Sequence, residues 1–432
     1  MAKWVYIKEI SGYVGEEVLL KGWVYNKRDS GRVKFILIRD GSGIIQTTIW
    51  SKDPDFPLFK VFNELSQETS VKVIGKVKED KRAPGGYELE ISDIEIVGNS
   101  IDYPITKKEH GTGFLMENRH LWIRSKRQNA ILRVRDNIIR SIRDFFHKEG
   151  FVLTDSPILT ANAAEGTTTL FETEYFDQKA YLAQTGQLYA EATAMSLGKV
   201  YTFGPTFRAE KSKTRRHLIE FWMIEPEWAF AELDDIFELA QNLIVYIVQR
   251  ALEDMKEELK ILERDTTVLE RVKPPFPKIR YDEAFEILKK SGKSETPYGD
   301  DFGGTDETII SEEFDRPVAV THYPANIKAF YMQPAPDDET KVLAMDILAP
   351  EGYGEIVGGS QRVHDYDLLL NKIKEHNLSE DVFKWYLDLR KYGSVPHSGF
   401  GMGLERMISW ICKLPHIREA IPFPRMLYNL YP

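Results

Sequence analysis

Cysteine is almost absent from this chain of 432 residues, and long apolar runs are absent altogether. The single cysteine, Cys412, cannot form an internal disulfide, which favours a reducing, cytoplasmic location. The longest clear apolar run, residues 243–248, is far shorter than the roughly 20 residues that a membrane-spanning helix needs, so we expect no membrane partner. The first residues lack the charged, apolar and small-residue layout of a signal peptide.

An excess of positive charge is also lacking. The chain has 57 Lys and Arg against 67 Asp and Glu, a formal net charge of −10, which argues against a protein that coats nucleic acid. This net charge does not exclude local basic patches that bind nucleic acid, because exposed charges are screened from one another beyond about 8–10 Å at physiological salt. Three such clusters occur, at 27–34, 119–127 and 207–217. Each could instead be an ordinary solvated surface.

Residues 1–100 have the pattern of an all-β domain. Runs rich in β-branched and aromatic residues are separated by Gly, Asp-Gly and Pro-Gly-Gly turns. Five short strands in about a hundred residues favour a small closed barrel, and the OB-fold is the commonest such barrel with a nucleic-acid role.

The pattern changes after residue 100. Residues 101–127 show no clean period and are expected to form a hinge. Apolar residues spaced by three and four then predict an amphipathic helix that ends near Gly150: Ile131, Val134, Ile138, Ile142 and Phe145. A short strand containing Pro157 should follow.

The remaining segments predict an α+β domain rather than repeated βαβ units. A long helix passes through residues 236–251, with Asp234 or Asp235 as its expected cap. Residues 341–350 and 353–362 should form adjacent strands joined by a Pro/Gly turn.

The segment 207–227 has the densest set of chemically useful residues. Arg208 and Glu210 alternate with apolar residues, so we expect both side chains on one strand face. A basic loop should lead to a return strand that carries Arg216, His217 and Phe221. Arginine offers a planar fork that matches phosphate, and an aromatic ring can stack on a purine. The alternative is a plain hairpin with surface ion pairs.

Two other segments suggest ligand contacts. Gly399, Gly401 and Gly403 recur at period two before Arg406, which suggests close approach of a flat ligand, although such glycines often mark only a bulge. The Asp346 and Glu355 carboxylates should lie on neighbouring strands, a pair that suits Mg²⁺ with phosphate oxygens and water, or else an exposed acidic pair.

Together these segments resemble the three signature motifs of the class II aminoacyl-tRNA synthetases, in the family's order. The barrel is similar to the anticodon-binding domain of the aspartyl/asparaginyl/lysyl branch, in its archaeal or eukaryotic type. The resemblance spans essentially the whole chain. It implies an N-terminal OB-fold β-barrel at 1–100, a hinge at 101–127 and, at 128–432, a catalytic domain with a mainly antiparallel sheet flanked by helices.

The resemblance also implies site residues, position by position. Arg208 and Arg406 would be the catalytic pair. ATP would contact Arg208, Glu210, His217, Phe221, Glu355, Gly403 and Arg406. The amino acid would contact Glu165, Gln187, Arg208, Glu225 and Arg362. The anticodon would contact Phe35, Gln46 and Arg28. The cofactor would be Mg²⁺, held by Glu355 and Asp346.

Three positions bear on which amino acid is used. Arg362 lies where the branch places the arginine that grips the side-chain oxygen. Ala190 falls where the aspartate enzymes carry a lysine, and Glu225 falls where they carry an aspartate. A pocket with one donor fork and one acceptor suits an amide, which offers one acceptor oxygen and one donor nitrogen. Gly358 falls where archaeal aspartate enzymes often carry a metal-binding serine.

The resemblance thus implies formation of an asparaginyl-adenylate from L-asparagine and ATP with release of pyrophosphate, then transfer to the 3′-terminal adenosine of tRNA(Asn), by a homodimer assembled through the first motif. One rival is an ammonia-dependent asparagine synthetase, which would need aspartate in the pocket and no barrel. The other is an inactive RNA-binding paralogue, which should have lost part of the set Arg208, Glu210, Phe221 and Arg406.

Overall fold

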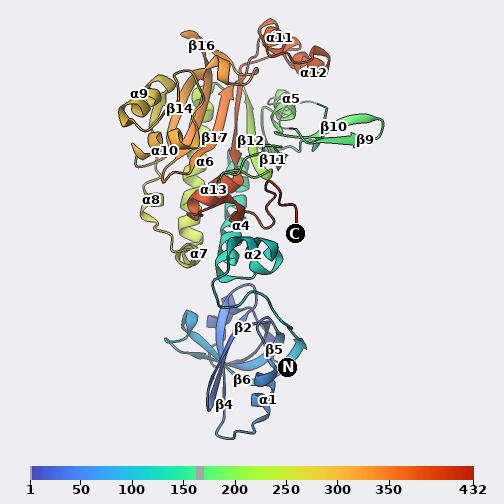
Figure 1. Cartoon of the computed structure of the whole chain (residues 1–432), viewed down its shortest axis with the longest axis vertical. Coiled ribbons are helices and arrows are strands. Elements are labelled where there is room, and N and C mark those ends of the chain that lie inside the picture. The colour runs from blue at the N-terminus through green and yellow to red at the C-terminus, as the bar shows by residue number, and fades with distance from the viewer. Residues whose placement is uncertain (1, 162–169) are drawn as a thin grey trace. The chain divides into compact units, whose positions relative to one another are not determined.

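The computed structural model describes residues 2–161 and 170–432 and divides the chain into two compact units, Met1–Met116 and Glu117–Pro432 (Figure 1). In the described ranges, no helix combines the length and apolar character needed to cross a membrane. Glu165 lies outside the described residues.

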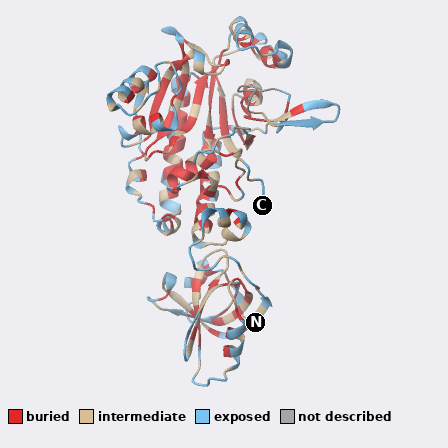
Figure 2. Ribbon diagram, in the orientation of Figure 1, coloured by how far each residue is buried: buried red, intermediate tan, exposed pale blue. Residues whose placement is uncertain are grey.

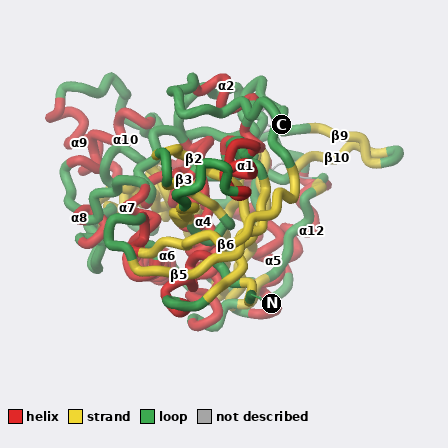
Figure 3. Tube along the Cα trace, turned by 90° about the horizontal axis from the view of Figure 1, so that it is seen from below, coloured by secondary structure: helices red, strands yellow, loops and turns green. Residues whose placement is uncertain are grey.

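The first unit is a closed β-barrel, as the sequence predicts. Its strands are β1 (Lys3–Trp4), β2 (Glu17–Ser30), β3 (Val33–Arg39), β4 (Ile44–Trp50), β5 (Ser70–Glu79) and β6 (Tyr87–Gly98). They pair in the order β1-β2-β3-β4-β6-β5, and β5 also pairs with β2, which closes the sheet. Figure 3 shows β5 and β6 running side by side.

The barrel also contains helical segments that an all-β reading misses. These are η1 (Ile7–Tyr13), α1 (Pro57–Glu64) and η2 (Pro84–Gly86). Phe59 and Phe62 of α1 are buried against the barrel core at a spacing of three residues. A helix this short, rich in residues that also favour strands, gives only a weak periodic signal.

The second unit is built on a mainly antiparallel sheet in the order β13-β14-β16-β17-β18-β12-β11-β7, with β15 paired to β16. The strands are β7 (Val152–Leu153), β11 (Lys199–Phe207), β12 (Glu220–Ala229), β13 (Lys278–Arg280), β14 (Val318–Pro324), β15 (Pro334–Ala335), β16 (Asp338–Ala349), β17 (Gly354–Gln361) and β18 (His397–Gly403). Among the described strand pairs of this sheet, β13–β14 and β11–β7 are the parallel ones. The predicted adjacency of residues 341–350 and 353–362 is confirmed by the β16–β17 pair.

A small second sheet contains β8 (Leu159–Thr160), β9 (Glu172–Tyr175) and β10 (Gln178–Leu182), and Figure 1 shows the β9–β10 hairpin extending away from the large sheet. Pro157 lies between β7 and β8 rather than within a strand, which corrects the expected Pro157 strand. Proline lacks the N–H that a ladder position needs.

The helices that follow the barrel are α2 (Thr112–Glu117), α3 (Arg119–Trp122), α4 (Lys126–Lys148), α5 (Gln187–Leu197), α6 (Leu233–Asp254), α7 (Lys256–Ile261), α8 (Thr267–Glu270), α9 (Tyr281–Ser291), α10 (Gly304–Glu312), α11 (Tyr366–Glu375), α12 (Glu380–Lys391) and α13 (Leu404–Ile411), with short turns η4 (Ala325–Ile327) and η5 (Ile417–Glu419). The helix predicted to end near Gly150 is confirmed as α4. Its five predicted apolar residues are buried in the core shared with α6, α13 and the sheet (Figure 2).

Two local expectations need correction. The N-cap of α6 is Glu232, and Asp235 is the third helical residue, whose side chain accepts from the Glu232 backbone N–H at 2.8 Å. The predicted cap therefore belongs to the reciprocal half of a capping box. In the second basic cluster, Arg119 is 1% exposed and donates to the backbone oxygens of Ile421 and Pro422. That arginine holds the C-terminal segment and is not a solvated charge.

Candidate active site

Two adjoining cavities lie against the large sheet. The larger has a volume of about 640 Å³ and the smaller about 80 Å³. Arg362 lines the larger cavity, Arg406 lines the smaller one, and Arg208 lines both. The two cavities also share Met223, Glu355 and Gly401. The three arginines are therefore distributed along one hollow, with Arg208 where its two parts meet.

The β11–β12 hairpin supplies Arg208 and the ring expected to bind a purine. Arg208 and Glu210 follow the last residue of β11 instead of sharing its face, which corrects the strand expectation. One further ladder bond, from the Arg208 backbone N–H to Ile219 O at 2.9 Å, still fixes where Arg208 lies. Its guanidinium carbon is 5.5 Å from the centre of the Phe221 ring.

His217 and Arg406 line the smaller cavity together with Glu210 and Phe221. His217 lies in the loop before β12, not on that strand as expected. Burial, and then the nearby Arg406, lower the pKa of His217, so the ring is neutral near pH 7. Arg406 donates to the backbone oxygen and the carboxylate of Glu355 at 2.9 and 3.1 Å.

Arg216 and Glu307 also belong to this region, although the family resemblance assigns neither of them a site role. Arg216, expected on the return strand, lies instead in the same loop as His217 and lines the smaller cavity. Its Nη1 donates to Glu307 Oε2 at 3.0 Å, and burial, followed by the charge of Glu355, raises the pKa of Glu307 to about 7. Residues 256–310 contain no motif that indicates Glu307, because only the tertiary fold brings α10 to the loop.

The two candidate metal ligands face a common space. They lie on neighbouring strands, as predicted, and a Cβ added to Gly358 would be 2.6 Å from Glu355 Oε1 and 3.3 Å from Asp346 Oδ1. Lys328 Nζ lies 2.9 Å from the other oxygen, Asp346 Oδ2. Among the described residues, no group of three His, Cys, Asp or Glu side chains could hold a metal ion. Two carboxylates suit Mg²⁺ when phosphate and water supply its other ligands.

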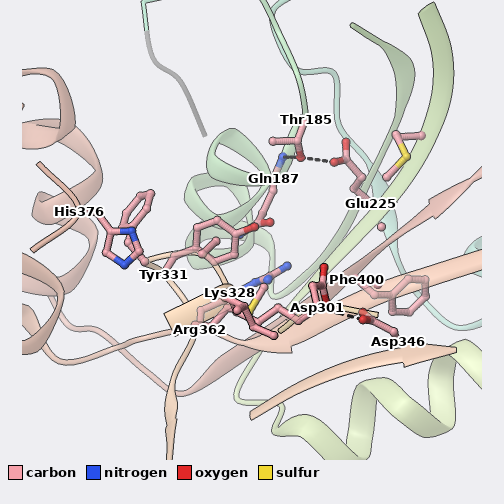
Figure 4. Close-up of a pocket in the computed structure, with 18 of the residues that line it drawn as sticks. Thr185, Gln187, Glu225, Asp301, Lys328, Tyr331, Asp346, Arg362, His376 and Phe400 are labelled. Atoms are coloured by element: carbon pink, nitrogen blue, oxygen red, sulfur yellow. Dashed lines mark hydrogen bonds and ion pairs between the residues drawn. The ribbon is translucent and has the colours of Figure 1, made fainter. Parts of the chain in front are cut away.

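The larger cavity contains the residues expected to select the amino acid. Gln187 begins α5, and Glu225 lies on β12 (Figure 4). Glu225 accepts from Thr185 Oγ1, from the Gly186 backbone N–H at 2.8 Å and from Thr202 Oγ1 at 3.1 Å, which fixes its carboxylate. Ala190, on the next turn of α5, is fully buried and does not line the cavity.

Arg362 is held in place by Glu227, a residue to which the sequence analysis gives no role. The Arg362 Nη2 and Nε atoms lie 2.5 and 3.3 Å from the Glu227 carboxylate, and Nη1 donates to Ser360 Oγ at 2.6 Å. Burial works against the charged guanidinium, but the Glu227 carboxylate outweighs it and raises the pKa of Arg362. The sequence does contain an indication of this role, because Glu225 and Glu227 lie two residues apart on one strand and their side chains share one face.

The three glycines of β18 have different neighbours. A Cβ on Gly399 would meet Glu227 and the Pro226 backbone oxygen at 2.2–2.3 Å, so protein atoms, not a flat ligand, require that glycine. A Cβ on Gly401, which lines both cavities, would meet Met223 Cε at 2.5 Å. Gly403 lines the smaller cavity, and the atom nearest to a Cβ there would be Arg406 Cγ, at 3.7 Å.

The candidate anticodon residues lie together on the barrel of the first unit. Phe35 alternates with the buried Lys34 and Ile36, so its ring faces outward and is half-exposed. The Arg28 guanidinium carbon is 4.6 Å from the centre of that ring. Gln46, on the adjacent strand β4, donates to Glu88 Oε2 at 2.7 Å.

Known protein families match both units of the chain. Residues 112–427 match the family of tRNA synthetases class II (D, K and N), and residues 18–97 match the OB-fold nucleic acid binding domain. The asparagine–tRNA ligase of Symbiobacterium thermophilum is 55% identical over 436 residues, with all of both chains covered. The same ligase of Chloroflexus aurantiacus is 56% identical over 432 residues, covering 99% of this chain and 98% of its own.

Solved structures of aminoacyl-tRNA synthetases also match the chain over its full length. The asparaginyl-tRNA synthetase from Pyrococcus horikoshii, complexed with asparaginyl-adenylate, matches with a TM-score of 0.96 and 46% identity over the full length of both chains. A putative aspartyl-tRNA synthetase from Leishmania major matches at 0.86 and 25% identity, covering all of this chain and 95% of its own. With the family match over residues 112–427, these relatives show that the chain belongs to the class II tRNA synthetases of the D, K and N group.

Proposed function

We propose that this chain joins asparagine to tRNA(Asn) in two steps. Asparagine and ATP first form asparaginyl-adenylate with release of pyrophosphate, and the asparaginyl group then passes to the 3′-terminal adenosine of the tRNA. The observation that carries this proposal is the position of Arg208, which lines both the smaller cavity with Phe221 and Arg406 and the larger cavity with Glu225 and Arg362. Asparagine–tRNA ligases at 55–56% identity over nearly the full length support it.

The first step needs no nucleophile from the protein. The asparagine carboxylate attacks the α-phosphorus of ATP, the bond to the bridging oxygen breaks, and pyrophosphate leaves. Arg208 holds the α-phosphate and the carboxylate together and stabilises the charge that develops between them. Arg406 and His217 hold the outer phosphates, while Phe221 stacks on the adenine and Glu210 accepts from its amino group.

Mg²⁺ fits the space shared by Glu355 and Asp346, and those two carboxylates would hold it. When bound, the ion neutralises phosphate charge. Arg406 contributes beside it, because its bonds to Glu355 orient that carboxylate before ATP arrives. Lys328 does the same for Asp346.

Selection of asparagine follows from Arg362 and Glu225. The Arg362 guanidinium donates to the side-chain oxygen of asparagine, and Glu225 accepts from its amide nitrogen. Aspartate would bring a second carboxylate toward Glu225, and two such charges about 4 Å apart repel by roughly 4 kcal/mol at an effective dielectric of about 20. That repulsion disfavours the wrong amino acid.

The chain acts as a cytoplasmic homodimer. Support for the dimer comes from apolar side chains left exposed around β7 and β8: Val152, Leu153, Ile158 and Leu159. Support for a reducing compartment comes from the lone, buried thiol of Cys412. In the barrel of residues 1–100, Phe35 stacks on the central anticodon base and Gln46 and Arg28 contact it, while residues 128–432 form the catalytic domain.

The test is exchange of labelled pyrophosphate into ATP, with asparagine and aspartate compared in parallel on the full chain. Exchange should depend on asparagine and be disrupted by Arg208→Ala, which should still bind tRNA(Asn). Equal exchange with aspartate would refute the asparagine assignment. Formation of asparagine from aspartate and ammonia would instead support the rival asparagine synthetase. Absence of exchange with both amino acids would refute the proposal that the chain is an enzyme that forms an aminoacyl-adenylate.

A further inference from the structure

A buried carboxylate on α5 lies behind the amino-acid cavity. Glu191 is 0% exposed, and its two oxygens lie within hydrogen-bond distance of side chains from three elements, α5, α12 and β18. Glu191 Oε1 accepts from Gln187 Nε2 at 3.0 Å. Oε2 accepts from Arg390 Nη2 at 2.6 Å and lies 2.9 Å from His397 Nε2. The hydroxyl of Tyr386 lies 2.8 Å from both oxygens.

This arrangement fixes which end of the Gln187 side chain faces the cavity. An ionised carboxylate can only accept hydrogen bonds, so the amide must turn its NH₂ group toward Glu191. Its carbonyl oxygen, Oε1, then points the other way. Within residues 2–161 and 170–432, no donor contacts that oxygen, and Gln187 lines the larger cavity. Gln187 thus presents a hydrogen-bond acceptor, and not a donor, to the cavity.

The charge on Glu191 is secured by its neighbours. Burial alone would raise the pKa of Glu191, but Arg390 and then His397 outweigh burial and lower it. A protonated carboxyl group could both donate and accept a hydrogen bond. It would therefore be compatible with either orientation of the Gln187 amide. The Arg390 ion pair therefore preserves the orientation of Gln187 as well as the packing of α12 on α5.

We propose that Glu191 is a positioning residue that turns the Gln187 carbonyl oxygen into the cavity, where it accepts a hydrogen bond from the α-ammonium group of the amino-acid substrate. This inference rests on the proposed function, because it assumes that an amino acid occupies the larger cavity. Glu191 itself contacts no substrate and acts only through Gln187.

The variant Glu191→Gln should reverse the amide. Arg390 requires an oxygen at the Oε2 position, so the new side chain must place its NH₂ group at the Oε1 position, opposite Gln187. Gln187 can then accept a hydrogen bond from that NH₂ group only through its own carbonyl oxygen, so the Gln187 NH₂ group turns toward the cavity. A donor there repels the α-ammonium group but has no effect on a ligand that lacks one.

The experiment compares asparagine with succinamate, the same molecule without its amino group, in pyrophosphate exchange by the full chain. In Glu191→Gln, the KM for asparagine should rise about tenfold or more, since the lost bond involves a charged group. The KM for ATP and the inhibition constant of succinamate should both stay within about twofold. Equal weakening of asparagine and succinamate would reveal a merely structural role and overturn the proposal, as would unchanged binding of both.

Two further variants complete the design. Tyr386→Phe removes a different hydrogen bond from the same carboxylate but leaves the Gln187 contact, so its KM for asparagine should stay near that of the wild type. If Glu191→Gln does not fold, Glu191→Asp takes its place, because it keeps the charge and withdraws the oxygen from Gln187. Selective loss of asparagine affinity supports the proposal, and parallel behaviour of the two ligands overturns it. Absence of exchange in the wild-type chain would count against the proposed function instead.

Discussion

Gly399 leaves the space that the Glu227 carboxylate occupies. A Cβ on Gly399 would lie 2.2 Å from Glu227 Oε1, a separation that real Cβ atoms do not show. The same carboxylate holds the guanidinium of Arg362 at 2.5 Å. The glycine on β18 therefore constrains the position of Arg362 through the Glu227 side chain on the neighbouring strand β12.

Replacing Gly399 by alanine should accordingly damage both stability and substrate binding. We expect about 1–3 kcal/mol of destabilisation from the forced displacement of Glu227 and the backbone. The KM for asparagine should rise while the KM for ATP changes little. Gly204→Ala is the matched control, because nothing lies within 4 Å of its added Cβ on β11. Urea unfolding and exchange kinetics measure the two effects, and equal behaviour of the two variants would contradict the role given to Gly399.

Glu225→Gln should relax discrimination against aspartate. The substitution removes the roughly 4 kcal/mol like-charge repulsion estimated for charges about 4 Å apart at a dielectric of about 20. The ratio of kcat/KM for asparagine over aspartate should fall by about tenfold or more, mostly through improved use of aspartate. Glu220→Gln, on the same strand, is the control. A ratio that stays at the wild-type value would mean that Glu225 does not select the side chain.

Local patterns predict much of this fold. The period of α4 and the antiparallel β16–β17 pair follow from spacing and turn residues that lie close together in the sequence. Features that depend on distant partners do not follow in this way. Arg119 has the composition of a surface charge, yet it is buried because the backbone oxygens of Ile421 and Pro422 satisfy it.

The candidate site shows the same division. Arg208, Phe221 and Arg406 could be named because their motifs have a fixed spacing. Glu307 could not, since only the tertiary fold brings α10 against the Arg216 loop. One sequence feature does point to Glu191: it lies four residues after Gln187 and so shares a face of α5 with it. That spacing indicates contact between the two side chains, but not that the pair is buried beneath a cavity.

Phe35→Ala should separate the two halves of the reaction. The ring faces outward from β3 and belongs to the barrel unit, so the variant should support asparagine-dependent exchange at the wild-type rate. Charging of tRNA(Asn) should weaken by about 1–3 kcal/mol in kcat/KM, the usual effect of losing one stacked base. Exchange serves as the internal control. Undiminished charging would assign the ring to packing of the barrel surface.

ATP binding should take up protons through His217. Burial and Arg406 hold the pKa of the free imidazole below its ordinary value, since both disfavour the charged ring. A triphosphate beside the ring favours the charged form and raises that pKa. Between the two pKa values the complex holds more protons than the free protein, so ATP affinity should increase as the pH falls through that interval. Calorimetry at about pH 6 in buffers of different ionisation enthalpy measures the uptake. His217→Asn should abolish it, and undiminished uptake by that variant would place the titrating group elsewhere.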